Sequence, residues 1–135
     1  DEKLMSVTLR GTVQTTFINA YMETAKNHWK NEERYAKLKN IFNKYRNLGP
    51  TFTGGDFNAR VQTRQATYEN CIGPHTFDTH NITLDAQDDD VTENRNLFIN
   101  HCRNTDTIVA NTWFQKPDKK TGNLSKLPYP TRPAI

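Results

Sequence analysis

The chain has 135 residues, of which 34% are apolar and 10% aromatic, and its formal net charge is +3. This length and composition predict one globular domain with a modest core and exclude a disordered polymer. No apolar run approaches the roughly 20 residues that a membrane-spanning helix needs. The sequence opens on acidic residues rather than on a basic segment followed by an apolar one, so we expect no membrane span and no targeting address.

The two cysteines, Cys71 and Cys102, lie in neither a C-x-x-C spacing nor a pattern with paired histidines. They therefore indicate neither a structural zinc site nor a disulfide framework. Reduced thiols in an intracellular, reducing compartment are the expectation.

The first third of the chain predicts a hairpin followed by an amphipathic helix. Residues 6–10 and 13–21 are rich in β-branched and aromatic side chains, and the Gly11-Thr12 pair between them is typical of a tight antiparallel connection. From Lys26 to Asn47, large apolar residues recur every three or four positions, which indicates a helix with one apolar face. Gly49-Pro50 is expected to end that helix.

Basic residues are concentrated on this predicted helix. The segment from Lys26 to Arg46 contains seven of them, against Glu32 and Glu33. A basic face of this kind is a footprint for nucleic acid. It is equally typical of an ordinary solvated helix surface, so both interpretations remain open.

The rest of the chain is predicted to alternate short regular elements with loops. A short strand leads into the glycine pair of TFTGGDFNAR at residues 51–60, and sites of α/β proteins are commonly built where a strand ends. Residues 61–91 are polar and aperiodic, which indicates a long surface loop. A helix is expected over 93–103 and a strand over 107–114. The Pro- and Lys-rich residues 116–135 predict an extended arm or tail.

The segment GGDFNAR at 54–60 contains the clearest chemical motif. Side chains two residues apart on an extended strand point the same way, so Asp56 and Asn58 are expected to converge on one substrate. A carboxylate can orient or deprotonate water, an amide can donate to a phosphoryl oxygen, and glycines allow close backbone approach. These groups suit phosphodiester hydrolysis. The alternative is a structural turn, because Asp and Asn side chains also hydrogen-bond their own backbone.

GGDFNARV at 54–61 resembles the signature of the endonuclease/exonuclease/phosphatase superfamily, most closely the endonuclease domain of non-LTR (LINE-type) retrotransposons. Similar segments in the family's order extend the resemblance over residues 13–115: FINAY at 17–21, the helix before the motif, CIGPH at 71–75, NLFINHC at 96–102 and NTWFQ at 111–115. The resemblance implies a two-sheet α/β sandwich that cuts DNA with magnesium. It places Asp56 and Asn58 in the active-site pair and Tyr21 near the scissile phosphate, whereas Asn111 and Trp113 match a structural strand.

The chain also departs from the family pattern. Glu23 stands where a proline usually follows the tyrosine by two positions. The family's upstream asparagine strand and metal-binding glutamate segment have no counterpart here, and neither does its closing Ser-Asp-His segment. None of the four histidines fits that last position: His28 and His101 are expected at surface or boundary positions of helices, and His75 and His80 in the long loop. The expected fold is a partial two-sheet α/β sandwich over residues 1–115.

Two functions are consistent with this set of residues. In the first, the chain is a magnesium-dependent endonuclease domain in which Asp56 activates a water while Asn58 and Tyr21 hold the phosphoryl oxygens of DNA, with a catalytic set that is incomplete in this chain. In the second, it is a non-catalytic structural or accessory subunit, and protein partners cover its open sheet edges and half-covered apolar faces.

Two further clusters carry weaker signals. The acidic run 88–90 offers hard oxygen ligands for a divalent cation, although a solvated acidic loop explains it better. Trp113 and Phe114 precede a group of lysines (Lys116, Lys119 and Lys120), a mixture found in proteins that bind single-stranded nucleic acid. A place for Trp113 in the core is the favoured alternative.

Overall fold

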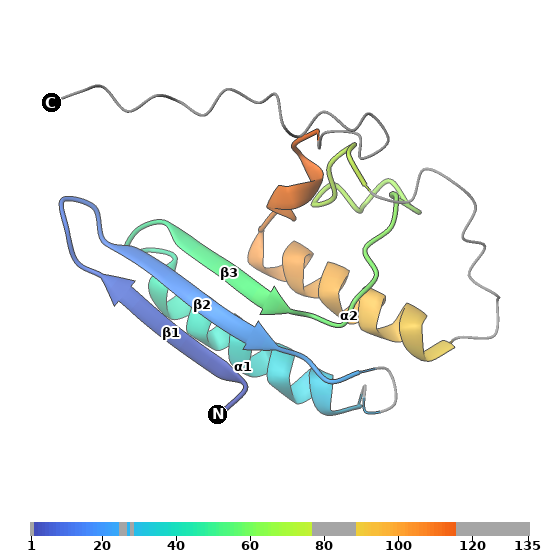
Figure 1. Cartoon of the computed structure of the whole chain (residues 1–135), viewed down its shortest axis with the longest axis horizontal. Coiled ribbons are helices and arrows are strands. Elements are labelled where there is room, and N and C mark those ends of the chain that lie inside the picture. Colours follow the sequence, from blue (N-terminus) through green and yellow to red (C-terminus); the bar gives the residue numbers. More distant parts are fainter. Residues whose placement is uncertain (1, 25–26, 28, 77–88, 116–135) are drawn as a thin grey trace, which may run out of the picture.

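The computed structural model describes residues 2–24, 27, 29–76 and 89–115. Three strands form one sheet in the order β1-β2-β3: β1 (Leu4–Leu9), β2 (Thr15–Tyr21) and β3 (Thr51–Asp56). Strand β1 runs antiparallel to β2, and β3 runs parallel to β2 (Figure 1). The mixed α/β class and the predicted N-terminal hairpin are therefore confirmed.

Strand β2 alternates in burial because its side chains point to opposite faces of the sheet. Thr16, Ile18 and Ala20 are buried, whereas Phe17 and Tyr21 are exposed on the other face. The buried side belongs to the hydrophobic core that the two helices complete.

Helix α1 (Trp29–Tyr45) connects β2 to β3 and covers one face of the sheet (Figure 1). Its apolar stripe buries Tyr35, Leu38 and Phe42, as the three- and four-residue spacing predicts. The chain leaves the helix through Gly49, whose φ of 156° and close approach to the Gln14 carbonyl require the absence of a side chain. The predicted helix and its glycine-proline end are confirmed.

Helix α2 (Asp89–Thr105) packs against α1 and extends beyond the predicted residues 93–103 at both ends. Phe98, Ile99 and Cys102 are buried in the shared core. Cys71 is also buried, and both cysteines are free thiols. No helix in the described part of the chain is long and apolar enough to cross a membrane.

The prediction of a surface loop after residue 61 is partly wrong. The segment up to residue 76 lacks regular structure, but Glu69, Cys71 and Ile72 are buried in it, because it packs against α2 and the core. Residues 77–88 of the predicted loop lie outside the described part of the chain, as does the predicted tail 116–135.

The predicted strand over 107–114 is also wrong, and with it the strand match of Asn111 and Trp113. A 3-10 helix, Ala110–Thr112, occupies this position. The Thr112 N–H bonds locally, donating to the Val109 carbonyl at 2.9 Å. Val109 instead donates to the Cys71 carbonyl, so the segment pairs with the irregular chain near residue 71 and not with the sheet.

The sheet face opposite α1 is apolar, and no described element covers it. Five side chains on this face are each at least 47% exposed: Met5, Val7, Leu9, Phe17 and Phe52. Residues 2–24, 27, 29–76 and 89–115 form one sheet and its helical layer, and they do not form the second sheet of a sandwich.

Candidate active site at the carboxyl ends of the parallel strands

The predicted site residues Tyr21 and Asp56 lie side by side. They are register partners at the last positions of β2 and β3, and the carboxyl ends of parallel strands meet at one edge of the sheet. The register places both on the face opposite α1, and both are exposed. The Lys3 ammonium lies 4.3 Å from the centre of the Tyr21 ring and adds positive charge beside the phenol.

Asn58 joins this pair through a turn and not through strand alternation. Strand β3 ends at Asp56, and Asn58 has a left-handed backbone with φ of 45°, which Asn tolerates better than most residues. Its N–H donates to Asp56 Oδ1 at 2.9 Å, the bond of an Asx turn. The argument from two-residue alternation is therefore wrong, because the backbone between these residues is not extended.

The side chain of Asn58 also ties the two strand ends together. Its Nδ2 donates to the Met22 carbonyl at 2.8 Å, and the Met22 N–H donates to the Asp56 carbonyl at 2.9 Å. One of the two amide hydrogens is thus used within the protein. The structure brings Asp56, Asn58 and Tyr21 to one edge of the sheet, and the turn geometry of the alternative interpretation is present as well.

The basic helix is separate from this edge. Helix α1 lies on the face of the sheet opposite Tyr21 and Asp56, and some of its charges are paired within the protein. Arg34 contacts Glu23 at 3.2 Å, and Lys37 contacts Glu33 at 2.8 Å. The position of α1 favours a solvated helix surface over a nucleic-acid footprint continuous with the site.

Glu23, which replaces the family's proline, is part of the chain that leaves Tyr21. Its N–H donates to Asn31 Oδ1 at 2.7 Å, and its carbonyl accepts bonds from Asn31 Nδ2 and Asn94 Nδ2, each at 3.1 Å. Sequence reasoning missed Asn31 and Asn94. A signal was present, since both occupy the apolar stripe of their helices, where a polar residue implies a buried hydrogen-bond network.

The buried pair of Glu69 and Arg95 was missed as well. Arg95 Nη1 lies 2.7 Å from Glu69 Oε1 and Nη2 lies 2.8 Å from Oε2, and each side chain is only 3% exposed. Hydrogen bonds from Arg95 lower the pKa of the Glu69 carboxyl despite its burial. This pair fixes the irregular segment that follows Asn58, because Arg95 also donates to the carbonyls of Val61 and Thr63.

The described histidines are His75 and His101. His101 is buried beside Tyr35, with ring centres 5.3 Å apart, and burial lowers its pKa to about 4. The expectation of a surface or boundary position for His101 is therefore wrong, because α2 turns that side chain toward α1. His28 and His80 lie outside the described residues.

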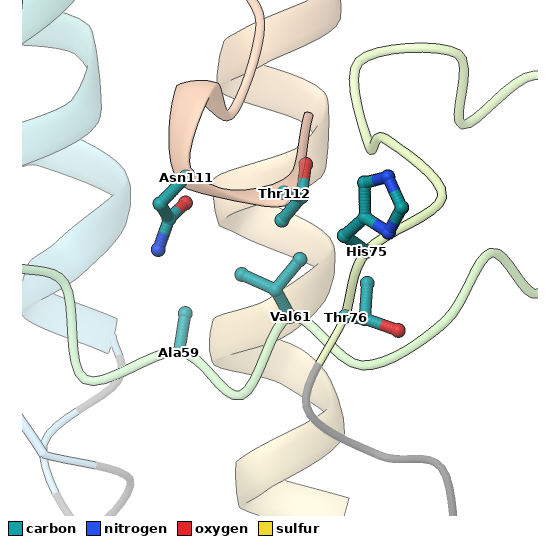
Figure 2. Close-up of a pocket in the computed structure, with 6 residues that line it drawn as sticks. All are labelled: Ala59, Val61, His75, Thr76, Asn111 and Thr112. Atoms are coloured by element: carbon teal, nitrogen blue, oxygen red, sulfur yellow. The ribbon is translucent and has the colours of Figure 1, made fainter. Parts of the chain in front are cut away.

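His75 lines a pocket of about 220 Å³ between three segments of the chain (Figure 2). Ala59 and Val61 come from the segment after Asn58, and Asn111 and Thr112 come from the 3-10 helix. The His75 N–H donates to the Thr112 carbonyl at 2.9 Å, so a backbone hydrogen bond joins the segment of His75 to the 3-10 helix at this pocket. The pocket contains no carboxylate beside the histidine and indicates no catalytic pair.

The weaker clusters of the sequence can be placed only in part. Trp113 is 40% exposed and Phe114 is 72% exposed, so neither belongs to the core, although Trp113 Nε1 donates to the Cys71 carbonyl at 3.3 Å. The favoured core position of Trp113 is wrong. The lysines of that cluster and Asp88 of the acidic run lie outside the described residues.

Asp56 is the carboxylate that the site offers to a metal ion. The described residues contain no group of three or more His, Cys, Asp or Glu side chains that would hold an ion. Magnesium, however, usually keeps several waters and binds through one or two carboxylates together with substrate phosphates. Asp56 therefore fits a magnesium ion held mainly by water and substrate, and does not fit an ion caged by these residues alone.

No known protein family, curated protein or solved structure matches this chain.

Proposed function

We propose that the chain is an endonuclease-like phosphodiesterase domain of the endonuclease/exonuclease/phosphatase type, acting on DNA with magnesium. The observation that supports this most is the meeting of Tyr21, Asp56 and Asn58 at the open carboxyl edge of β2 and β3. The resemblance of GGDFNARV assigns chemistry to the same three residues. Two independent lines, motif and geometry, thus lead to one edge of the sheet.

Asp56 is the general base in this proposal. Its carboxylate is exposed, and the bond from the Asn58 N–H to Oδ1 fixes its orientation without burying it. The other oxygen accepts the proton of an attacking water. A turn that only shapes the backbone would not require an exposed carboxylate beside an exposed tyrosine.

Tyr21 and Asn58 bind the phosphate. The Tyr21 hydroxyl and the second Nδ2 hydrogen of Asn58 donate to phosphoryl oxygens, and the Lys3 ammonium adds positive charge close to Tyr21. Besides acting as the base, Asp56 would hold magnesium together with water and substrate oxygens, and the ion would supply stabilisation of the charge that develops on the phosphoryl group.

The proposed fold is one half of a two-sheet sandwich. The exposed apolar face of Met5, Val7, Leu9, Phe17 and Phe52 suits a second sheet packed about 10 Å away. In this proposal the leaving oxygen takes its proton from water, because His101 is buried beside Tyr35 and the pocket that His75 lines contains no carboxylate beside it. The catalytic set is thus incomplete within the described residues, and nicking is expected to be slow.

Nicking of supercoiled plasmid in magnesium tests the proposal. We expect slow nicking by the parent chain that disappears with a chelator and in Asp56→Ala, and that falls in Tyr21→Phe. Glu32→Ala and Tyr68→Phe are matched controls, because both residues are exposed and neither belongs to the candidate site. Nicking that survives chelation, or that Asp56→Ala retains, overturns the proposal.

The exposed apolar face favours a second candidate, a non-catalytic accessory subunit. Phe17 and Phe52 stack on each other at 5.5 Å between ring centres, in a row with Val7, and apolar surface of this kind marks protein interaction sites. Protein partners would cover this face and the free edges of β1 and β3. Sedimentation of the purified chain distinguishes the two: a stable monomer that nicks DNA supports the enzyme, whereas a folded chain that self-associates through this face and is inert supports the subunit.

A further inference from the structure

Two buried carboxamides lie directly beneath the candidate site. Asn31 on α1 is 0% exposed and Asn94 on α2 is 1% exposed. Asn31 Nδ2 donates to Asn94 Oδ1 at 2.9 Å, so the pair joins the two helices inside the core. Burying an amide is unfavourable unless it is hydrogen-bonded, which makes a pair of them in a core a feature that requires a role.

Both carboxamides hold the chain that leaves the two parallel strands. Glu23, two residues beyond Tyr21, is held by three bonds, from its N–H to Asn31 and from both Nδ2 groups to its carbonyl. Asn94 Nδ2 also donates to the Asn58 carbonyl at 3.1 Å. The Asn31–Asn94 pair therefore holds both Glu23, which follows β2, and Asn58, which follows β3.

Through Asn58 the network reaches the Asp56 carboxylate. The Asn58 backbone is left-handed, a conformation that persists when surrounding contacts determine it. Its carbonyl is held by Asn94, its Nδ2 by Met22, and its N–H binds Asp56 Oδ1. The orientation of Asp56 thus depends on a turn that is anchored to α2.

We infer that Asn31 and Asn94 are positioning residues of the candidate site: they fix the turn that aims Asp56 and the chain that carries Tyr21. The assignment of a catalytic purpose rests on the proposed function. The anchoring itself is a property of the fold, and the experiment below measures it separately.

Amide hydrogen exchange measures the anchoring directly. In Asn94→Ala and Asn94→Leu we expect the N–H groups of Glu23 and Asn58 to exchange roughly tenfold faster or more, because the bonds that Asn94 donates to the carbonyls of these two residues are lost and the backbone there is released. The ratios between the exchange rates of the core amides in α1 and β2 should stay unchanged. Asn100→Ala, an exposed asparagine on the same helix, is the matched control. Two Asn94 substitutions of different size are tested, because the inference can be judged if either variant folds.

Unchanged exchange at Glu23 and Asn58, or a uniform increase over the whole core, overturns the inference, since the network would then be mere core packing. Where the parent chain nicks plasmid, Asn94→Ala should lower kcat at least tenfold with little change in KM. A lowered stability with kcat intact also overturns it. Local acceleration in a chain whose parent never nicks DNA leaves the anchoring standing and removes the proposed function.

Discussion

Removing Arg95 should destabilise the protein strongly and in a pH-dependent way. Arg95→Met leaves the Glu69 carboxylate buried without its cation, after loss of two bonds to the carboxylate and two to the backbone carbonyls of Val61 and Thr63. Removing one partner of a buried ion pair lowers the free energy of unfolding by about 3–5 kcal/mol. Since a domain is stable by about 5–15 kcal/mol, the variant should lose a large share of its stability.

The sign of the pH dependence follows from Glu69. Its pKa in the folded parent is lowered by Arg95, so the pair contributes stability above the unfolded pKa of about 4.5 and loses it as pH falls through the lower folded value. In Arg95→Met burial raises that pKa, and the buried acid is neutral at low pH. The difference in unfolding free energy between parent and variant should therefore be largest near pH 7 and shrink toward pH 3.

Urea unfolding followed by circular dichroism at several pH values measures this difference. Arg103→Met on the same helix is the control, because Arg103 is exposed and rests on the Tyr68 ring. The double variant Arg95→Met with Glu69→Leu should recover much of the loss, since an apolar pair avoids the stranded charge. A loss below about 1 kcal/mol, or a double variant as unstable as the sum of the singles, would refute the reasoning.

Three further perturbations have defined outcomes. His101 has its pKa lowered to about 4 by burial, so stability should fall by about 3 kcal/mol as pH drops from 6.5 to 4, and unfolding of His101→Gln over that range should show a flatter profile. Leu38→Ala, at a fully buried position, should cost about 2–5 kcal/mol in urea unfolding, whereas Leu48→Ala, at an exposed position, should cost less than about 0.5 kcal/mol. Gly55→Ala should weaken the β2–β3 pairing by more than about 1 kcal/mol in urea unfolding, because Gly55 has φ of 133° and an added Cβ would meet the Ala20 carbonyl. Gly54→Ala has open space around the added Cβ and should have a mild effect in the same measurement. Equal effects of the two glycine variants would contradict the geometry.

The elements with a strong local period could be predicted from the sequence. The hairpin is predicted by the β-branched and aromatic residues on both sides of the Gly11-Thr12 pair, and α1 is predicted by the spacing of Tyr35, Leu38 and Phe42. These signals are local, so they need no knowledge of distant contacts. The segment 107–114 has a similar β-branched composition, yet it forms a 3-10 helix because its backbone partners, near Cys71, are distant in sequence.

The position of the candidate site along the chain could be predicted from the sequence, but its geometry could not. The short strand before the glycine pair predicts Asp56 and Asn58 at a strand end, and the family resemblance adds Tyr21, which the register places beside Asp56. The two-residue alternation failed because β3 stops at Asp56, a boundary that no local pattern marks. The supports beneath the site, Asn31 and Asn94, come from two helices that are far apart in the sequence, so only the packing of α1 against α2 brings them together.

The most direct test of the proposed function is the ratio of single-turnover nicking rates between the parent chain and Asp56→Asn in saturating magnesium. The substitution keeps the size of the side chain and the acceptor for the Asn58 N–H, and it removes the base. A positioned general base contributes about 10²–10⁴-fold, so we predict a rate at least about a hundredfold lower in the variant. Equal rates, or no magnesium-dependent nicking by a folded parent chain, would contradict the assignment of Asp56 and leave the turn as a purely structural feature.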